Sequence, residues 1–509
     1  MNFVEPILRL GRLQPEAEAL IDGDRIVTYG ELAVLVPRTS GHLAALGVKP
    51  GDRVGLCLKD SWAHLVTMLA VGRMGAVVVP IDWRARPQEK SRVADALGLK
   101  LVLAEPESQV SWPCPAVALD EVWHRHVALA SQPATLPDDW QAPFMISSTS
   151  GSTGAPKFVQ VTHFQLYFSN AIKIEMMALT ARRCFLSVLP LYFSGGRGWC
   201  LAQLWHGDCV ILHPPLLTAE EYVALIRKHK ASAGYIGPMI LRQLLRIAPA
   251  SGYLLPETTL YCGGAPLFAE EKLEALRKVT PHFFQAYGTA ATDTICLLRP
   301  DVLSHRPESV GQPHPMMEIE VVDDDDRKLE PGAVGRFRCR GPNVASGLAG
   351  PNGWEGAHEG FRDGWYYPGD LATLDPEGYL FLKGRGAELI IRGGAKIHPL
   401  EIETALREHD AVAEAAVLGR HMADGEDEVV AFVVARRPVE TGALAAHCRA
   451  RLTPYKLPRE IHIVGELPKN AAGKIDKLEL RRRLDEPDQP AGSSRAPPGH
   501  VAVSANPGE

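Results

Sequence analysis

The chain has 509 residues, more than one compact core holds, so two or more domains are expected. An apolar fraction of 46% and a charged fraction of 22% are ordinary for a globular enzyme. A net charge of -6 at pH 7 does not favour a nucleic-acid-binding function, which would need a basic face.

Cysteine usage and hydropathy indicate the compartment. The nine cysteines are scattered and form no CxxC pair, which argues against a zinc ribbon or a disulfide framework and favours a reducing compartment. No apolar run reaches the length of a membrane span, and the first residues lack a signal-peptide core. We therefore expect a cytoplasmic protein without a membrane span.

Buried strands alternate with amphipathic helices in the first part of the chain. Residues 25–32 predict a strand followed by a helix, and residues 54–58 predict a strand. Residues 62–72 predict a helix, and residues 75–80 predict a buried strand. This alternation is typical of a layered α/β domain with parallel strands.

A loop rich in glycine and hydroxyl residues follows a short apolar strand at residues 142–146. It reads Ser147-Ser-Thr-Ser-Gly-Ser-Thr-Gly-Ala-Pro-Lys157, and Thr162 then predicts the N-cap of a helix that reaches about residue 179. Glycines let backbone N–H groups point inward, hydroxyls add donors, and a lysine adds the charge that a polyphosphate needs. The loop differs from GxxxxGK[ST], because no Ser or Thr follows the lysine. A flexible Ser/Gly linker has the same composition, but the flanking strand and helix favour a phosphate-binding loop.

This loop resembles the phosphate-binding loop of the adenylate-forming (ANL) superfamily, which contains acyl-CoA synthetases, peptide-synthetase adenylation domains and firefly luciferases. Further stretches resemble its other motifs in the same order, so the resemblance covers residues from about 15 to 485. It implies an α/β fold: a large N-terminal domain of layered α/β subdomains plus a β-rich subdomain, with a small mobile α+β C-terminal domain. We expect the large domain at residues 1–386 and the small one at residues 387–486. The Pro/Gly/Ser-rich tail at residues 487–509 is expected to be disordered.

Several positions match the nucleotide-binding motifs of the superfamily. Residues 263–266 resemble a gly-gly-ala-pro segment whose backbone lies along the adenine, and residues 287–289 resemble the start of Tyr-Gly-x-Thr-Glu, whose tyrosine packs on adenine. Asp370 matches the aspartate that takes both ribose hydroxyls, and the resemblance implies that Arg385 lies on the phosphate-ribose side. The residues that the resemblance assigns to ATP are Thr149, Ser150, Gly151, Ser152, Thr153, Gly154, Lys157, Gly263, Gly264, Ala265, Tyr287, Gly288, Thr289, Asp370 and Arg385.

The metal site departs from the family pattern. Ala290 and Ala291 stand where the superfamily has a threonine and the glutamate that holds magnesium, and alanine cannot ligate a hard cation. A shifted turn would let Thr292 and Asp293 substitute. Otherwise Mg²⁺ arrives on ATP, with waters completing its octahedron. The metal ligands stay unassigned at this point, and a catalytically weakened nucleotide-binding relative remains an alternative.

The acyl pocket is expected near Phe193 and Tyr235. The superfamily has a histidine at the place of Phe193, and a phenyl ring implies an apolar wall, with plain core packing as the alternative. Residues 194–196 offer no anion for a substrate ammonium, which disfavours amino acids. Arg197 is expected to be solvated rather than paired with a second carboxylate. An uncharged, aromatic or medium-length acid is the expected substrate.

The junction and the small domain carry the remaining motifs. Ala387 stands at the hinge about which the small domain rotates in the superfamily, and Gly393 and Gly394 match the backbone track for the pantetheine of CoA. Lys474 sits at the place of the lysine that bridges carboxylate and α-phosphate during adenylation, so the resemblance implies that it is catalytic.

Coarser patterns predict the remaining elements. Helices at 399–408 and 442–452 with strands at 414–418, 428–435 and 460–464 predict a small α+β domain. Residues 309–317 and 335–343 predict strands of the β-rich subdomain, and the acid run 323–326 predicts a solvated hairpin turn.

The motifs imply one reaction and two alternatives. A carboxylic acid would be activated by ATP to an acyl-adenylate and transferred to CoA, giving acyl-CoA, AMP and pyrophosphate. ATP, Mg²⁺ and CoA are the implied cofactors of this AMP-forming acid–thiol ligase. The alternatives are an acyl-AMP ligase that loads an acyl carrier protein and the weakened relative already mentioned.

Overall fold

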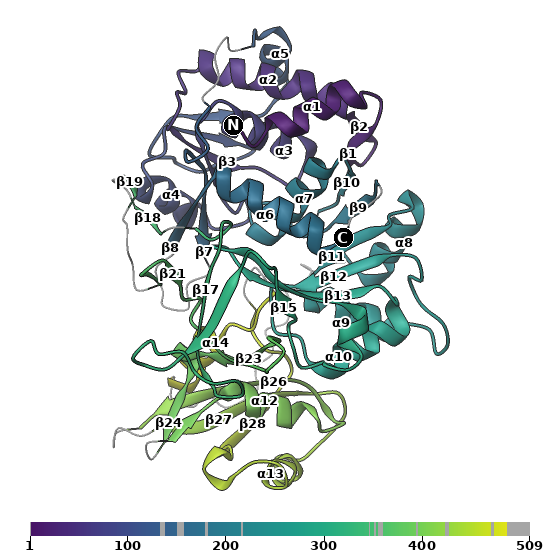
Figure 1. Cartoon of the computed structure of the whole chain (residues 1–509), viewed down its shortest axis with the longest axis vertical. Coiled ribbons are helices and arrows are strands. Elements are labelled where there is room, and N and C mark those ends of the chain that lie inside the picture. Colours follow the sequence, from purple (N-terminus) through teal and green to yellow (C-terminus); the bar gives the residue numbers. More distant parts are fainter. Residues whose placement is uncertain are drawn as a thin grey trace, which may run out of the picture.

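The structure is a computed structural model (Figure 1). It describes residues 2–132, 138–149, 157–178, 182–214, 217–345, 347–350, 353–354, 360–392, 395–422, 427–469 and 473–485. The N-terminal α/β layers occupy the top of Figure 1, a β-rich region lies beneath them, and the C-terminal elements form a separate unit at the bottom. The expected combination of layered α/β, β-rich and small α+β parts is confirmed.

A six-stranded sheet in the order β6-β5-β3-β4-β7-β8 forms the first layer. Its strands are β3 (Arg53–Cys57), β4 (Val77–Pro80), β5 (Leu101–Ala104), β6 (Ala116–Ala118), β7 (Pro143–Thr149) and β8 (Lys157–Thr162). The helices of this part of the chain are α1 (Glu5–Leu13), α2 (Tyr29–Ala45), α3 (Trp62–Arg73), α4 (Pro87–Ala96), α5 (Glu121–Leu129) and α6 (His163–Met176). All pairs are parallel except the β7–β8 hairpin.

A nine-stranded sheet in the order β15-β14-β13-β12-β11-β9-β10-β1-β2 forms the second layer. Its strands are β1 (Glu18–Asp22), β2 (Arg25–Thr28), β9 (Cys184–Ser187), β10 (Cys209–Leu212), β11 (Ala233–Ile236), β12 (Thr259–Gly263), β13 (Phe283–Thr289), β14 (Asp293–Leu298) and β15 (Gln312–Pro313). The associated helices are α7 (Ser194–His206), α8 (Ala219–His229), α9 (Pro238–Ile247), α10 (Ala269–Glu274), the π-helical turn η1 (Ala275–Val279) and α11 (Pro300–Leu303). The inner strands are parallel, as predicted, and antiparallel strands close both edges.

The prediction for residues 309–317 was wrong in extent and in sheet. Only Gln312 and Pro313 form a strand, and they pair with β14 at the edge of the nine-stranded sheet. Prolines at 313 and 315 lack the N–H that a longer ladder needs, so the strand stays short.

The β-rich part is a sheet in the order β20-β21-β17-β22-β23, with β16 also paired to β17. Its strands are β16 (Glu318–Val322), β17 (Gly335–Arg340), β20 (Phe361–Arg362), β21 (Trp365–Tyr366), β22 (Asp370–Leu374) and β23 (Leu380–Arg385), while β18 (Ala349–Gly350) pairs with β19 (Gly353–Trp354). The acid run forms a turn after β16, as predicted, but it is not wholly solvated. Asp326 accepts hydrogen bonds from Arg336 at 2.9 Å and Arg362 at 2.8 Å, because these arginines converge on the turn.

The C-terminal elements form their own small core. They are the turn η2 (Gly386–Glu388), β24 (Ile390–Arg392), β25 (Ala395–Ile397), α12 (Pro399–Arg407), β26 (Val412–His421), β27 (Asp427–Ala435), α13 (Thr441–Arg449), η3 (Pro454–Lys456), β28 (Glu460–Val464) and α14 (Lys477–Asp485). The predicted helix–strand–strand–helix–strand order is confirmed. Apolar side chains of β26, β27, α12 and α13 bury each other, so this part has a core separate from the large sheets.

Thr162 shows how the sequence sets an element boundary. Its hydroxyl accepts from the Gln165 N–H at 3.2 Å, and the Gln165 side chain accepts from the Thr162 N–H at 2.8 Å. This capping box starts α6 at the predicted residue. The helix ends at Met176, before the predicted residue 179, which lies outside the described residues.

All nine cysteines are free thiols, in agreement with the prediction. Across the described ranges, no helix has the length and apolarity needed to cross a bilayer. The tail expected to be disordered lies outside the described residues.

Candidate active site

The loop with the phosphate-binding pattern joins β7 to β8. The hairpin ladder between these strands ends with Thr149 opposite Lys157, so the segment between them connects two adjacent strand ends. Ser150, Gly151, Ser152, Thr153 and Gly154 lie outside the described residues, as do the side chains of Thr149 and Lys157. Their phosphate contacts therefore stay predictions.

Tyr287, Asp370 and Arg385 form one hydrogen-bonded group at the junction of two sheets. The Tyr287 hydroxyl donates to Asp370 Oδ2 at 2.6 Å, and Arg385 Nη1 donates to Asp370 Oδ1 at 3.1 Å and to the Pro368 carbonyl at 2.6 Å. Asp370 opens β22 directly across from Arg385, which ends β23, so the ladder register brings the two together. Burial, and then Asp370, raise the pKa of Tyr287, so its phenol stays a donor.

Lys474 belongs to the C-terminal part but lies within electrostatic range of this group. Burial and the neighbouring Arg385 lower the pKa of Lys474, while Asp370 opposes them. Three residues later, Lys477 Nζ donates to Glu388 Oε2 at 2.6 Å and lies 2.8 Å from Glu403 Oε1. This partly buried group ties the segment of Lys474 to the turn that contains Ala387.

The glycines of the predicted adenine track lie where two strands approach each other closely. A Cβ on Gly263 would lie 2.3 Å from the Ala286 carbonyl oxygen, so only glycine fits there. Gly264 has φ +86°, a conformation that favours glycine, and Ala265 is half-buried. Similarly, a Cβ on Gly288 would lie 1.7 Å from the Asp293 carbonyl oxygen, which explains the glycine after Tyr287.

Tyr235 belongs to a buried aromatic cluster beside these glycines. It is buried and stacks on Trp199 with ring centroids 4.7 Å apart and an interplanar angle of 12°. Cβ atoms built on Gly195 and Gly263 would lie 3.5 Å and 2.8 Å from the Tyr235 ring and hydroxyl. Phe193, the other expected substrate residue, is half-buried and packs on Tyr192 at 4.4 Å.

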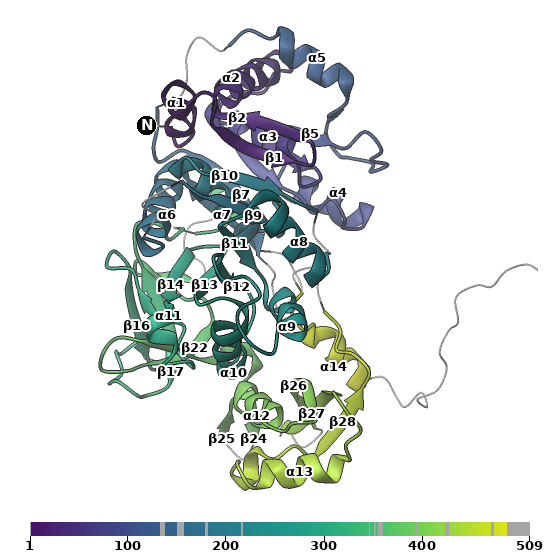
Figure 2. The same ribbon diagram turned by 90° about the vertical axis from the view of Figure 1, so that its right-hand side faces the viewer.

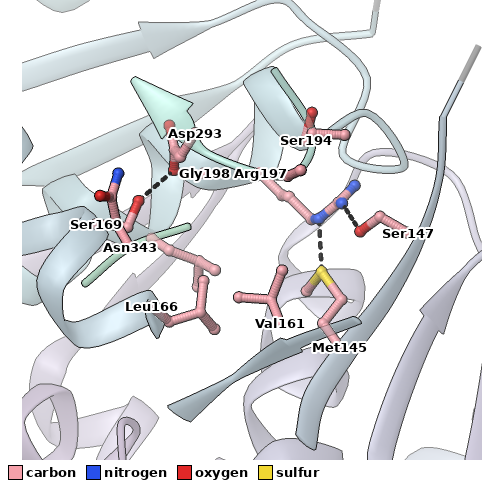
Figure 3. Close-up of a pocket in the computed structure, with 13 residues that line it drawn as sticks. Met145, Ser147, Val161, Leu166, Ser169, Ser194, Arg197, Gly198, Asp293 and Asn343 are labelled. Carbon is pink, nitrogen blue, oxygen red and sulfur yellow. Dashed lines mark hydrogen bonds between the residues drawn. The ribbon is translucent and has the colours of Figure 1, made fainter. Parts of the chain in front are cut away.

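A cavity of about 40 Å³ lies between β7, α6, α7 and the turn before β14 (Figure 3). Apolar side chains form one side, and Arg197 and Asp293 bring charge to it (Figure 3). The lining residues are Met145, Ser147, Val161, Leu166, Ser169, Ser194, Arg197, Gly198, Leu201, Ala290, Ala291, Asp293 and Asn343. The two alanines thus border this space, whereas neither Phe193 nor Tyr235 is among its lining residues.

The expectation that Arg197 is solvated was wrong. The residue is only 3% exposed, because α7 packs it against β7. Its Nε lies 2.7 Å from Met145 Sδ, one Nη donates to the Tyr192 carbonyl at 2.5 Å, and the other donates to Ser147 Oγ. Burial lowers the pKa of Arg197 to about 9, which leaves the guanidinium charged at neutral pH.

Asp293 is held by two residues of α6 that the sequence reasoning missed. Its Oδ2 accepts from Lys173 Nζ at 2.7 Å and from Ser169 Oγ at 2.7 Å. Lys173 is 1% exposed and also donates to the Gly198 carbonyl at 2.6 Å. The sequence does indicate that Lys173 is buried, because a lysine between Ile172 and Ile174 is unusual and positions 169 and 173 share one helix face.

The hydrogen bonds of Asp293 and Thr292 make this turn unsuited to bind Mg²⁺. Asp293 is the one carboxylate in the lining of the cavity, and it is committed to Lys173 and Ser169. Thr292 is also engaged, because its Oγ1 accepts from the Thr289 N–H at 3.0 Å. Among the described residues, no group of three or more His, Cys, Asp or Glu side chains could hold a metal. The residues present at this turn do not fit a directly ligated Mg²⁺.

The hinge and the expected CoA track are described only in part. Ala387 lies in η2, directly after Arg385 and Gly386. Gly393 and Gly394 lie outside the described residues. Their predicted role toward pantetheine stays a prediction.

Comparison with known proteins gives two family matches. The family model of AMP-binding enzymes matches residues 9–349. The model of the AMP-binding enzyme C-terminal domain matches residues 401–474.

Curated relatives and solved structures match over nearly the whole length. The chain is 30% identical to an indoleacetate–CoA ligase of Aromatoleum aromaticum, over 95% of this chain and 98% of the relative. It is 31% identical to a feruloyl-CoA synthase of Amycolatopsis sp, over 94% and 98%. The o-succinylbenzoate CoA synthetase of Bacillus subtilis, solved with its acyl-adenylate intermediate, superposes with a TM-score of 0.83 at 27% identity, covering 95% of this chain and 98% of that one.

Proposed function

The chain belongs to the family of AMP-binding enzymes, and we propose that it activates an aromatic carboxylic acid with ATP and transfers the acyl group to CoA. The reaction is that of an AMP-forming acid–thiol ligase. A carboxylate oxygen attacks the α-phosphorus of ATP, pyrophosphate leaves, and an acyl-adenylate forms. The CoA thiol then attacks the acyl carbon and AMP leaves.

The observation that carries the proposal is the group of Tyr287, Asp370 and Arg385 with Lys474 beside it. A carboxylate has about four lone-pair sites. Asp370 therefore still has capacity for two ribose hydroxyls after accepting from Tyr287 and Arg385. Lys474 brings a charge to the same region from the small domain. In the proposed first step this ammonium stabilises negative charge that develops on the α-phosphate.

An aromatic acid is favoured by the wall that Tyr235 and Trp199 form. Gly195 and Gly263 lie beside the ring and the hydroxyl of Tyr235 and bring no side chain of their own, and flat apolar surfaces suit an aromatic ring. Relatives named for indoleacetate and ferulate point to the same substrate class. We assign Phe193 to the outer part of this wall.

Magnesium enters this scheme with ATP. Mg²⁺ tolerates a shell made of phosphate oxygens and waters, so it needs no carboxylate from the turn at Ala290 and Ala291. The protein residues proposed to meet the phosphates are those of the loop from Thr149 to Lys157. ATP, Mg²⁺ and CoA are thus the cofactors of the reaction.

CoA is the proposed thiol, presented along Gly393 and Gly394 after the small domain rotates about Ala387. We place the domain boundary there, with residues 1–386 before it and residues 387–486 after it, followed by a tail at 487–509. The carrier-protein alternative differs only in the acceptor. Nine free cysteines favour a reducing, cytoplasmic compartment.

Carboxylate-dependent ATP–pyrophosphate exchange tests the first half-reaction. A panel of arylacetates, cinnamates and aliphatic acids of matched size should give exchange that is strongest with the aromatic members. Adding CoA, or a pantetheinyl carrier protein in parallel, then identifies the acceptor by mass of the thioester. Absence of exchange with every acid would overturn the proposal, and exchange with aliphatic acids alone would overturn the substrate class.

A further inference from the structure

We propose that Arg407 and Glu271 position the small domain for adenylation and thereby hold Lys474 beside the nucleotide site. Glu271 lies on α10 of the large domain, and Arg407 ends α12 of the small one. Figure 2 shows α10 directly above α12, at the boundary between the two parts. This inference rests on the proposed two-step reaction.

The contact has the geometry of a specific ion pair. Arg407 Nη2 donates to Glu271 Oε1 at 2.6 Å, and the two side chains are 11% and 10% exposed. The Arg407 guanidinium also lies over the Phe268 ring, 3.8 Å from its centroid. Phe268 is the N-cap residue of α10, and its N–H donates to Glu271 Oε2 at 3.1 Å. One small-domain arginine thus contacts both the carboxylate and the aromatic ring at the start of this helix.

Glu271 has a second partner that stays in the large domain. Arg242 Nε on α9 donates to Glu271 Oε1 at 2.7 Å. Removing one partner of a buried ion pair is expensive when the other charge is left alone. Here Arg242 would keep Glu271 paired after the small domain leaves, and Arg407 would pass to solvent. The contact is therefore suited to forming and breaking in each catalytic cycle.

The position of this contact relates it to the nucleotide site. Glu271 follows the adenine track by a few residues, and Arg242 Nη2 also approaches the Pro266 carbonyl at 3.5 Å. On the small-domain side, α12 carries Glu403, which lies 2.8 Å from Lys477 Nζ near Lys474. Arg407 and Lys474 thus belong to the same small domain.

Another ion pair between the two parts provides a control. Lys396 Nζ lies 3.1 Å from Asp324 Oδ2, but the side chains are 60% and 79% exposed. Exposed pairs contribute little, so this contact should not hold the domain. A second control is Arg451, which pairs with Glu408 next to Arg407 but entirely within the small domain.

The test separates the two half-reactions. Arg407→Met and Glu271→Gln should slow ATP–pyrophosphate exchange by roughly tenfold or more, while thioester formation from synthetic acyl-adenylate and CoA stays within about twofold or rises. Arg407→Lys should recover part of the exchange rate. Lys396→Met and Arg451→Met should leave both rates near wild type. Melting temperatures of all variants check that the domains stay folded.

Each outcome has one meaning. A wild type without exchange would refute the proposed function itself. A wild type with exchange, combined with equal loss of both half-reactions in folded Arg407→Met, would overturn the positioning role. Unchanged exchange in that variant would overturn it as well.

Discussion

The Tyr287 hydroxyl lies 2.6 Å from Asp370 Oδ2, although the two residues belong to different sheets and stand 83 positions apart. The nine-stranded sheet thus supplies the tyrosine proposed for adenine, and the β-rich sheet supplies the carboxylate proposed for ribose. One hydrogen bond holds the two at a fixed separation.

Loss of that hydrogen bond should weaken ATP binding. Tyr287→Phe keeps the ring but leaves Asp370 Oδ2 without its donor, at a cost of about 1–3 kcal/mol. We expect the KM for ATP in the exchange assay to rise roughly tenfold, with a smaller change in kcat. Tyr367→Phe removes a hydroxyl that donates to Asp326 at 3.0 Å, away from the nucleotide group, and serves as the control. Equal KM values for wild type and Tyr287→Phe would contradict the proposed role.

Lys474 should be required for the first half-reaction only. Lys474→Ala is expected to lower the exchange rate by roughly 10²–10³, since a charge contact made in the transition state is lost. Thioester formation from synthetic acyl-adenylate should survive. Equal damage to both steps would argue against this assignment.

The pH dependence of the exchange rate should also show that Lys474 acts in the first half-reaction only. Burial and Arg385 lower the pKa of Lys474 from 10.5, and the charged form is the one that acts. As pH rises through that lowered pKa the ammonium is lost, so exchange should decline at a pH below 10.5. The thioester step should lack this decline when both are followed across pH 8–11 in matched buffers, a range chosen to bracket roughly the free-lysine value.

Local patterns predicted the parts of the structure that depend on neighbours in sequence. The Thr162 capping box is readable because its two partners lie three residues apart. The burial of Arg197 is not readable, because an arginine is normally exposed and its acceptors depend on how α7 packs on β7. Lys173 and Asp293 are 120 positions apart, so the residues around Lys173 indicate a buried lysine but do not identify its partner. The same holds for Arg407 and Glu271, which meet only after the small part is in place.

Arg197 should contribute mainly to stability and to the shape of the site. Arg197→Met removes the donors to the buried Ser147 Oγ and to the partly buried Tyr192 carbonyl, and a buried acceptor left without a partner costs about 1–3 kcal/mol. We expect a clear loss in the free energy of unfolding, measured by urea denaturation, with slower exchange. Arg182→Met, at an exposed arginine that donates to the Gly207 carbonyl at 3.2 Å, should stay within about 0.5 kcal/mol. Wild-type stability in Arg197→Met would disprove the buried contacts.

The turn at Ala290 and Ala291 yields the last prediction, about magnesium. Asp293 holds Lys173 rather than a metal, so Asp293→Asn should leave the magnesium concentration for half-maximal exchange unchanged. It should nevertheless destabilise the fold by about 3–5 kcal/mol, because a lysine that is 1% exposed loses its counter-charge. Adding Lys173→Met should recover much of that loss, since a methionine buries no charge.

Ala291→Glu tests the same interpretation of the magnesium site by adding a carboxylate instead of removing one. A carboxylate at this place would border the cavity and give Mg²⁺ a protein oxygen, so it should lower the magnesium concentration needed for exchange. Some loss of stability is expected, because Ala291 is 1% exposed and a larger side chain must displace its neighbours. Magnesium titrations of the exchange rate in these variants decide whether Asp293 ligates Mg²⁺. A several-fold higher magnesium requirement in folded Asp293→Asn, absent in Lys173→Met, would show that Asp293 holds the metal after all.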